Sequence, residues 1–283
     1  MNSFVKDFLR EKICFYSPLP WAKNYTALIE QAAETGLRGV EFLNTAELAV
    51  PDMAAARELG RLAKSNGLII PCLSVGKNLV GEDSAESVAT VKKYAEICAA
   101  LEIPYLHHTV AFGLKKKSVA ETECAFAKGA EATMEIAEYA NGLGVKTLIE
   151  DQGFVVNGVE QYGKFRSATG NVFDVLLDVG NIYFMDESAG AFAESFAKNI
   201  VHTHVKEYNY TKTEPRGGAL YTTFGGNYLS NAVAGEGDID YDRVKNALAA
   251  ANYKGTYSME YSVKTPEELT RTFEYLAQIF GNM

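Results

Sequence analysis

The chain has 283 residues, of which 47% are hydrophobic, 11% aromatic and 22% charged, as is typical of a globular protein with enough apolar material for a core. This composition excludes disorder, collagen and coiled coil as descriptions of the whole chain. The 27 Lys and Arg residues stand against 36 Asp and Glu residues, so the net charge is −9. An acidic surface repels phosphate backbones, which argues against nucleic-acid binding.

No part of the sequence reaches the roughly 18 uncharged apolar residues that a membrane helix requires. Charges also interrupt the N-terminal segment 1–12, which therefore does not resemble a signal peptide. The four cysteines form no C-x-x-C pair and are widely separated, at Cys14, Cys72, Cys98 and Cys124. We therefore expect a soluble, cytoplasmic protein, without membrane contact, whose cysteines are reduced core thiols.

Short β-branched or aliphatic runs alternate along the chain with longer segments of helical period. The short runs predict eight strands, at 12–16, 39–42, 68–75, 105–110, 145–150, 172–179, 200–206 and 255–261. The longer segments predict helices near 24–36, 51–66, 84–101, 121–143, 159–169, 188–198, 240–251 and 265–280.

Eight strand–helix units of about 35 residues each are typical of a closed parallel (β/α)8 TIM barrel. The alternative is an open doubly wound sheet. The even spacing and the lack of a G-x-G-x-x-G turn after the first strand favour the barrel. Because no linker is visible, we interpret residues 1–283 as a single α/β barrel domain.

The segment 207–239, between the seventh predicted strand and the following helix, breaks this rhythm. It shows no clear helix or strand period, and glycines alternate in it with the aromatic residues Tyr208, Tyr210, Tyr221, Phe224 and Tyr228. A loop of this length in a compact domain is usually a functional lid or a subunit contact. A homodimer is therefore a candidate assembly.

Four consecutive predicted strands end in residue types that bind metals, namely Glu150, Asp178, His204 and Glu260. In a parallel barrel, these strand ends direct their side chains into one shared mouth. Three carboxylates crowded there repel one another unless a positive charge joins them, and a divalent cation supplies that charge. Oxygen-rich donors with one nitrogen favour Mn²⁺, with Mg²⁺, Co²⁺ and Zn²⁺ as alternatives.

These strand ends and their surroundings resemble the xylose isomerase-like TIM barrels, a superfamily that includes sugar-phosphate isomerases and epimerases. The resemblance rests on the phrases IED, LLDVGN and HTHVKE, and on AGEGDIDY before ALAAANYKGTYSMEY, and it spans nearly the whole chain. It implies that Glu150, Asp178, His204 and Glu260 bind the metal. In the epimerase branch, it also implies that Glu150 and Glu260 move protons on opposite faces of the substrate.

We therefore expect a metal-dependent isomerase or epimerase of a sugar, sugar phosphate or polyol, in which Glu150 and Glu260 are catalytic. A chelating cation acidifies the C–H bond next to a carbonyl and stabilises the resulting enediolate, and a carboxylate takes the proton. Two alternatives remain: an inosose-type dehydratase using the same metal site, and a barrel that binds a sugar without catalysis. Asn181 stands where ketose 3-epimerases tend to have His, which leaves the reaction open.

Further side chains are candidates for the substrate site. Lys206 follows His204 on the same strand face and can stabilise an enediolate oxygen or bind a phosphate. Asn181 can bind a hydroxyl, and Trp21 can cover an apolar part of the ligand. His108, or its neighbour His107, ends the fourth strand and can contact the substrate.

Two more acidic residues have open roles. Glu236 lies in the phrase GEG, and we expect it to orient His204 or otherwise support the site. Glu41 ends the second strand, where it can bind a hydroxyl or form a buried ion pair.

Overall fold

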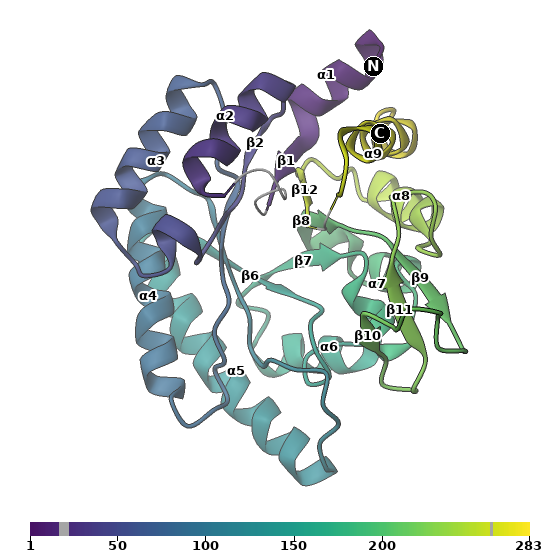
Figure 1. The fold of residues 1–283 in the computed structure, drawn as a ribbon. Coiled ribbons are helices and arrows are strands. Elements are labelled where there is room, and N and C mark those ends of the chain that lie inside the picture. The colour runs from purple at the N-terminus through teal and green to yellow at the C-terminus, as the bar shows by residue number, and fades with distance from the viewer. Residues whose placement is uncertain (17–22, 261–262) are drawn as a thin grey trace.

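The computed structural model describes residues 1–16, 23–260 and 263–283. Its centre is a parallel sheet surrounded by helices (Figure 1). The strands of this sheet are β1 (Ile13–Phe15), β2 (Gly39–Val40), β3 (Phe42–Leu43), β4 (Cys72–Val75), β5 (Tyr105–His108), β6 (Lys146–Glu150), β7 (Asp174–Asp178), β8 (Ile200–Val205) and β12 (Tyr257–Met259). They follow the order β2-β1-β12-β8-β7-β6-β5-β4-β3.

Closure of the barrel depends on β2 and β3, which are the two halves of the second predicted strand. The strand is interrupted at Glu41. The first half pairs with β1 and the second half pairs with β4, both in parallel, so one interrupted strand joins the two edges of the sheet. The prediction of a parallel (β/α)8 barrel is confirmed.

The helices around the barrel are α2 (Tyr25–Thr35), α3 (Met53–Ser65), α4 (Ser84–Ala100), α5 (Val119–Gly142), α6 (Val159–Ala168), α7 (Ala189–Phe196), α8 (Tyr241–Ala250) and α9 (Pro266–Phe280). All eight match predicted helices to within a few residues at either end. The last one begins as its sequence predicts, because the Thr265 side chain accepts a hydrogen bond from the Glu268 backbone. Within the described residues, no helix is long and apolar enough to span a bilayer.

One further helix, α1 (Ser3–Lys12), precedes the barrel and was not predicted. Asn2 caps it, and Val5, Phe8 and Leu9 form its buried face at helical spacing. The charges that interrupt segment 1–12 belong to the exposed face of this amphipathic helix.

The insertion 207–239 contains three short antiparallel strands, β9 (Tyr208–Thr211), β10 (Tyr221–Thr222) and β11 (Tyr228–Asn231), in the order β10-β11-β9. They form a small sheet at one side of the molecule, at the right in Figure 1. The expectation that this segment has no regular structure is therefore wrong. Strands of two to four residues are too short for alternating polarity to be recognised in the sequence.

The interior of the barrel changes from apolar to polar along its axis. Near the N-terminal ends of the strands, Cys72, Leu148 and Leu176 form a small apolar cluster. Two residues further along each strand, the side chains on the same face are Ser74, Glu150 and Asp178, all of which are buried. Cys14, Cys72 and Cys98 are buried thiols as expected, whereas Cys124 is exposed.

The buried carboxylate of Glu207 fixes both ends of the insertion. One oxygen, Oε1, accepts hydrogen bonds from the backbone amides of Tyr208 (3.2 Å) and Ile239 (3.1 Å), and Oε2 accepts one from Gly235 (2.9 Å). A single side chain thus accepts hydrogen bonds from three backbone donors, two of which, those of Tyr208 and Ile239, are buried and would otherwise lack a partner.

Replacement of Glu207 by Ala leaves these three amides without an acceptor. We expect the free energy of unfolding to fall by about 3 kcal/mol, measured by urea titration. Hydrogen exchange of the Gly235 and Ile239 amides should accelerate selectively. The control is Glu214→Ala, in an exposed part of the same insertion, which should change stability by less than about 0.5 kcal/mol. Equal effects of the two substitutions would contradict this role for Glu207.

Candidate metal and active site

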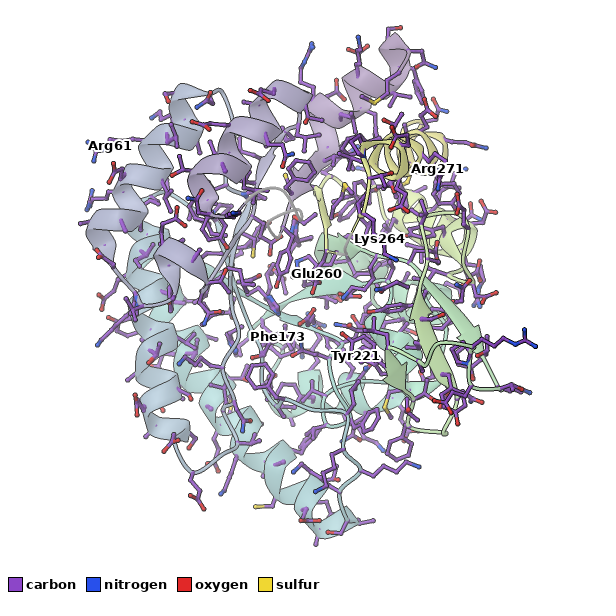
Figure 2. All side chains as sticks on the ribbon, viewed as in Figure 1. Arg61, Phe173, Tyr221, Glu260, Lys264 and Arg271 are labelled. Atoms are coloured by element: carbon purple, nitrogen blue, oxygen red, sulfur yellow. The ribbon has the colours of Figure 1, made fainter. Side chains whose placement is uncertain are left out.

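The C-terminal ends of four neighbouring strands bring the predicted ligand residues together. Glu150, Asp178, His204 and Glu260 each offer one ligand atom, and these four atoms lie within 4.8 Å of one another. They lie at the ends of β6, β7 and β8 and directly after β12. Figure 2 shows Glu260 near the centre of the barrel, with Tyr221 on the side of the insertion.

The imidazole of His204 lies among the carboxylates. Its Nδ1 atom is 2.8 Å from Glu260 Oε2, 3.7 Å from Glu150 Oε2 and 3.9 Å from Asp178 Oδ2. The side chains of His204, Glu150 and Asp178 are buried, whereas that of Glu260 is 26% exposed. The cluster is therefore open to solvent on the side of Glu260.

Lys206 provides a positive charge beside these carboxylates. Its Nζ atom is 2.7 Å from Asp178 Oδ2 and 3.2 Å from Glu260 Oε2, and it donates to Asn181 Oδ1 at 3.2 Å. Gly180 makes this position possible, because a Cβ atom there would come within 2.5 Å of Lys206 Cγ. The glycine of the phrase LLDVGN thus leaves room for the aliphatic part of the lysine.

The pKa shifts in the cluster have opposing causes. Burial raises the pKa of Asp178 to about 7, although Lys206 opposes this shift. Burial would also raise the pKa of Glu260, but Lys206 and His204 hold it below its usual range. The pKa of His204 is raised well above its ordinary value because Glu41 and Glu260 outweigh the effect of burial. The carboxylates therefore stabilise a positively charged group placed between them.

The donor atoms fit a divalent cation. His204 Nδ1, Asp178 Oδ2 and Glu260 Oε2 are buried and have ion-pair neighbours, but none has a hydrogen-bond partner among the described residues. Carboxylate oxygens with one imidazole nitrogen suit hard or intermediate cations such as Mg²⁺ and Mn²⁺.

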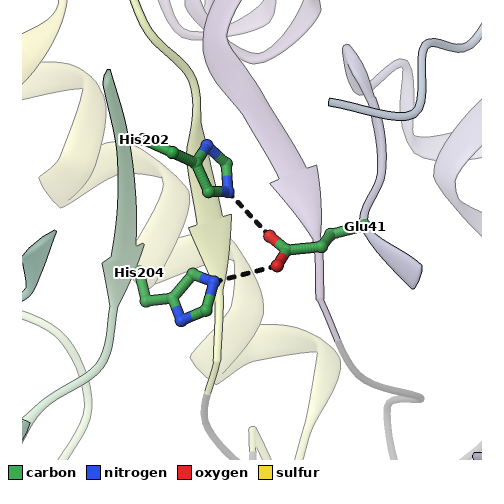
Figure 3. Close-up of side chains that lie close together, drawn as sticks. All are labelled: Glu41, His202 and His204. Carbon is green, nitrogen blue, oxygen red and sulfur yellow. Dashed lines mark hydrogen bonds and ion pairs between the residues drawn. The ribbon is translucent and has the colours of Figure 1, made fainter. Parts of the chain in front are cut away.

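Glu41 determines which nitrogen of His204 faces the carboxylates (Figure 3). Its fully buried carboxylate lies 3.0 Å from His204 Nε2 through Oε1 and 2.7 Å from His202 Nε2 through Oε2. With the proton of His204 on Nε2 and donated to Glu41, the lone pair of Nδ1 points at the cluster. This carboxylate–histidine pair is the arrangement that usually orients a metal-binding imidazole.

A second hydrogen-bonded arm runs from Glu41 towards Glu150. Ser74 Oγ donates to Glu41 Oε1 at 2.6 Å and lies 2.8 Å from His107 Nδ1. On its other side, His107 Nε2 is 3.5 Å from Glu150 Oε1, while Asn181 Nδ2 donates to Glu150 Oε2 at 3.2 Å. Glu150 therefore has neighbours that restrict both of its oxygens.

Three residues of the site were missed in the sequence. Ser74 is a small polar residue in an apolar strand, on the inward face, and that position is its only signal. Tyr16 follows β1, and its ring centroid lies 4.6 Å from that of His204. Asp151 Oδ1 accepts a hydrogen bond from the Asp178 backbone at 3.0 Å, and burial together with Asp178 raises the pKa of Asp151 well above its ordinary value.

The remaining sequence candidates lie elsewhere. Glu236 is at the surface, 54% exposed and paired with Arg271 at 2.9 Å, so it is Glu41 that contacts His204 in its place. His108 is fully buried, and its Nδ1 atom lies 3.2 Å from the carbonyl oxygen of Thr109. It points away from the barrel interior, because the preceding residue, His107, points inward. Trp21 lies outside the described residues.

A pocket of about 200 Å³ opens beside Lys206 and Glu260. Phe112, Phe184 and the insertion residues Tyr208 and Tyr221 supply its aromatic wall, and Gln152 and Asn181 supply amides.

Comparison with known proteins agrees with this architecture. Residues 29–279 match the family model described as xylose isomerase-like TIM barrel. The chain belongs to this family.

Two relatives with named activities and one solved structure are similar to this chain. D-psicose 3-epimerase of Agrobacterium fabrum is 26% identical over 259 residues, covering 87% of this chain and 82% of the relative. Inosose dehydratase of Lactiplantibacillus plantarum is 35% identical over 89 residues, or 30% of this chain and 29% of the relative. A family protein from Mycobacterium smegmatis, solved in complex with magnesium, has the same fold, with a TM-score of 0.73, 13% identity and coverage of 100% and 99%.

The burial of His108 predicts a pH-dependent stability. Burial lowers the pKa of His108 to about 4, whereas an exposed histidine has a pKa near 6.5. The folded protein therefore binds fewer protons than the unfolded chain between these values. The free energy of unfolding should fall as the pH drops through this window, by about 3 kcal/mol between pH 7 and pH 4.

Urea titrations across this pH range, on the wild type and on His108→Leu, isolate this contribution. The variant should lack it and show a shallower decline of stability. Parallel pH profiles would contradict the assignment of His108 as a buried neutral side chain.

Proposed function

We propose that this protein is a metal-dependent isomerase or epimerase of a sugar or polyol, acting through an enediolate. The observation that carries the proposal is the convergence of Glu150, Asp178, His204 and Glu260 within 4.8 Å. The similarity to D-psicose 3-epimerase over most of both chains supports a carbohydrate as substrate.

Glu150, Asp178, His204 Nδ1 and Glu260 would hold one divalent cation, and we propose Mn²⁺. When bound, such a cation polarises a carbonyl and acidifies the adjacent C–H bond. The magnesium complex of the Mycobacterium smegmatis protein supports a divalent cation in this family, and the oxygen-rich donor set accommodates either ion.

The two glutamates are the groups that transfer protons. They reach the cluster from β6 and β12, with β7 and β8 between them, so they approach a ligand in the mouth from different sides. If one carboxylate removes a proton and returns it to the neighbouring carbon, the product is an isomer. If the other carboxylate delivers a proton to the opposite face, the product is an epimer.

Lys206 and Asn181 position the substrate. The ammonium of Lys206 can donate to the oxygen that gains negative charge, since it already lies at the edge of the pocket. Asn181 bridges Lys206 and Glu150, so its amide orients both groups.

The pocket favours an uncharged sugar over a sugar phosphate. Of the described residues that line it, Lys206 is the only cationic one, and two carboxylates already neutralise its charge. The two cations of the insertion, Lys212 and Arg216, are not among the residues of its wall. Aromatic rings instead offer apolar surface to the C–H groups of a sugar.

A second candidate is a dehydratase reaction at the same site, favoured by the 35% identity to inosose dehydratase over 89 residues. It would begin with the same proton removal and end with loss of a hydroxyl.

The test combines metal analysis with deuterium exchange. The purified protein, loaded with Mn²⁺, is incubated in D₂O with D-psicose, D-fructose, D-tagatose and inososes, and the products are followed by NMR. We expect deuterium at the carbon beside the carbonyl with the carbon skeleton and hydroxyls retained. Glu150→Gln and Glu260→Gln should each lower kcat by about 10²- to 10⁴-fold.

Glu236→Gln, at the surface, serves as the matched control and should retain activity. Loss of water from an inosose would identify the dehydratase instead. A protein that binds no divalent metal, or that exchanges no substrate proton when loaded, would contradict the proposal.

A further inference from the structure

A large cavity lies at the N-terminal end of the barrel, at the opposite end of the strands from the metal cluster. Its volume is about 1170 Å³, slightly above the range of typical small-molecule and cofactor sites. It lies between α3 and the chain segments that enter β4, β5, β8 and β12.

The floor of this cavity, here called the basal cavity, is apolar. Ile69, Ile70 and Pro71 precede β4, and Tyr105 and Val201 come from β5 and β8. The last two pack against the small apolar cluster inside the barrel. The basal cavity can therefore hold an apolar or aromatic body.

The rim of the basal cavity is strongly cationic, although the chain as a whole carries a net charge of −9. Five cations line it, against the single carboxylate of Glu102: Arg57, Arg61, Lys64, Lys198 and Lys254. Among the described residues, no carboxylate forms an ion pair with any of these five. A concave surface lined by one sign of charge concentrates its field and attracts a counter-ion.

Three of these cations lie together on an exposed face of α3. Arg57, Arg61 and Lys64 follow one another at helical spacing, so they share a face of α3 and repel. The helix dipole favours Lys64, which is in the last turn, but not Arg57, which is in the first half of the helix. A bound anion would compensate all three.

The basal cavity is also connected to the metal cluster by hydrogen bonds. Thr256 lines the cavity, and its Oγ1 atom lies 3.1 Å from His202 Nδ1. The other ring nitrogen of His202 is 2.7 Å from Glu41, which contacts His204 at 3.0 Å. A ligand that moves Thr256 would therefore act on the imidazole that faces the carboxylates.

We propose that the basal cavity binds a small phosphate monoester with an apolar body, and that binding changes the metal affinity through Thr256, His202 and Glu41. Arginine pairs recognise phosphate oxygens through charge-assisted hydrogen bonds, and the apolar floor receives the organic part. The binding part stands independently of the proposed function, whereas the effect on the metal rests on it.

Calorimetric titration with 1-naphthyl phosphate tests the site, and 1-naphthol is the uncharged control probe. The double variant Arg61→Glu/Lys254→Glu should bind 1-naphthyl phosphate at least about tenfold more weakly than the wild type, and 1-naphthol should bind the wild type at least about tenfold more weakly than its phosphate. The matched control Lys93→Glu/Lys128→Glu reverses two exposed charges that do not line the cavity and should bind normally. No saturable binding, or equal binding by both double variants, would overturn the site.

Titration of Mn²⁺ with and without saturating 1-naphthyl phosphate tests the connection. The two Mn²⁺ affinities should differ by at least about fivefold in the wild type, and by less in Thr256→Val. An unchanged Mn²⁺ affinity would overturn the connection. Complete absence of Mn²⁺ binding would refute the proposed function and the connection together, while the probe titration would still decide the site.

Discussion

The mutual repulsion of three carboxylates at one end of the barrel governs the arrangement around them. Glu150, Asp178 and Glu260 come from three different strand ends, and closure of the sheet brings them together whatever their charge. Such a group is stable only with positive charge at its centre. The ammonium of Lys206 and the imidazole of His204 both lie next to these carboxylates and reduce their repulsion. A divalent cation bound by the same ligand atoms would reduce it further.

Glu41 extends this arrangement into the barrel interior. The break between β2 and β3 places its carboxylate where it meets two histidines and a serine, so one buried group positions both His204 and the neighbours of Glu150. The same carboxylate contacts His202, and the other ring nitrogen of His202 contacts Thr256 in the wall of the basal cavity. The two ends of the barrel therefore share a continuous set of hydrogen bonds.

The barrel and the convergence of the four ligand residues could be predicted, because strand alternation and strand-end position are properties of the local sequence. The direction of the His108 side chain could not be predicted, because a shift of one residue along β5 decides whether His107 or His108 points into the barrel. Glu236 was expected to orient His204 or otherwise support the site, whereas the carboxylate that contacts His204 is that of Glu41, which is 163 residues away in the chain. The strands of the insertion and the basal cavity depend on tertiary packing, and no periodic signal marks them.

Anomalous diffraction from crystals soaked in Mn²⁺ tests the central claim most directly. The account predicts one strong manganese peak bounded by Glu150, Asp178, Glu260 and the Nδ1 atom of His204. No peak at saturating manganese would contradict it. So would a peak confined to the space between Glu41, His202 and the Nε2 atom of His204.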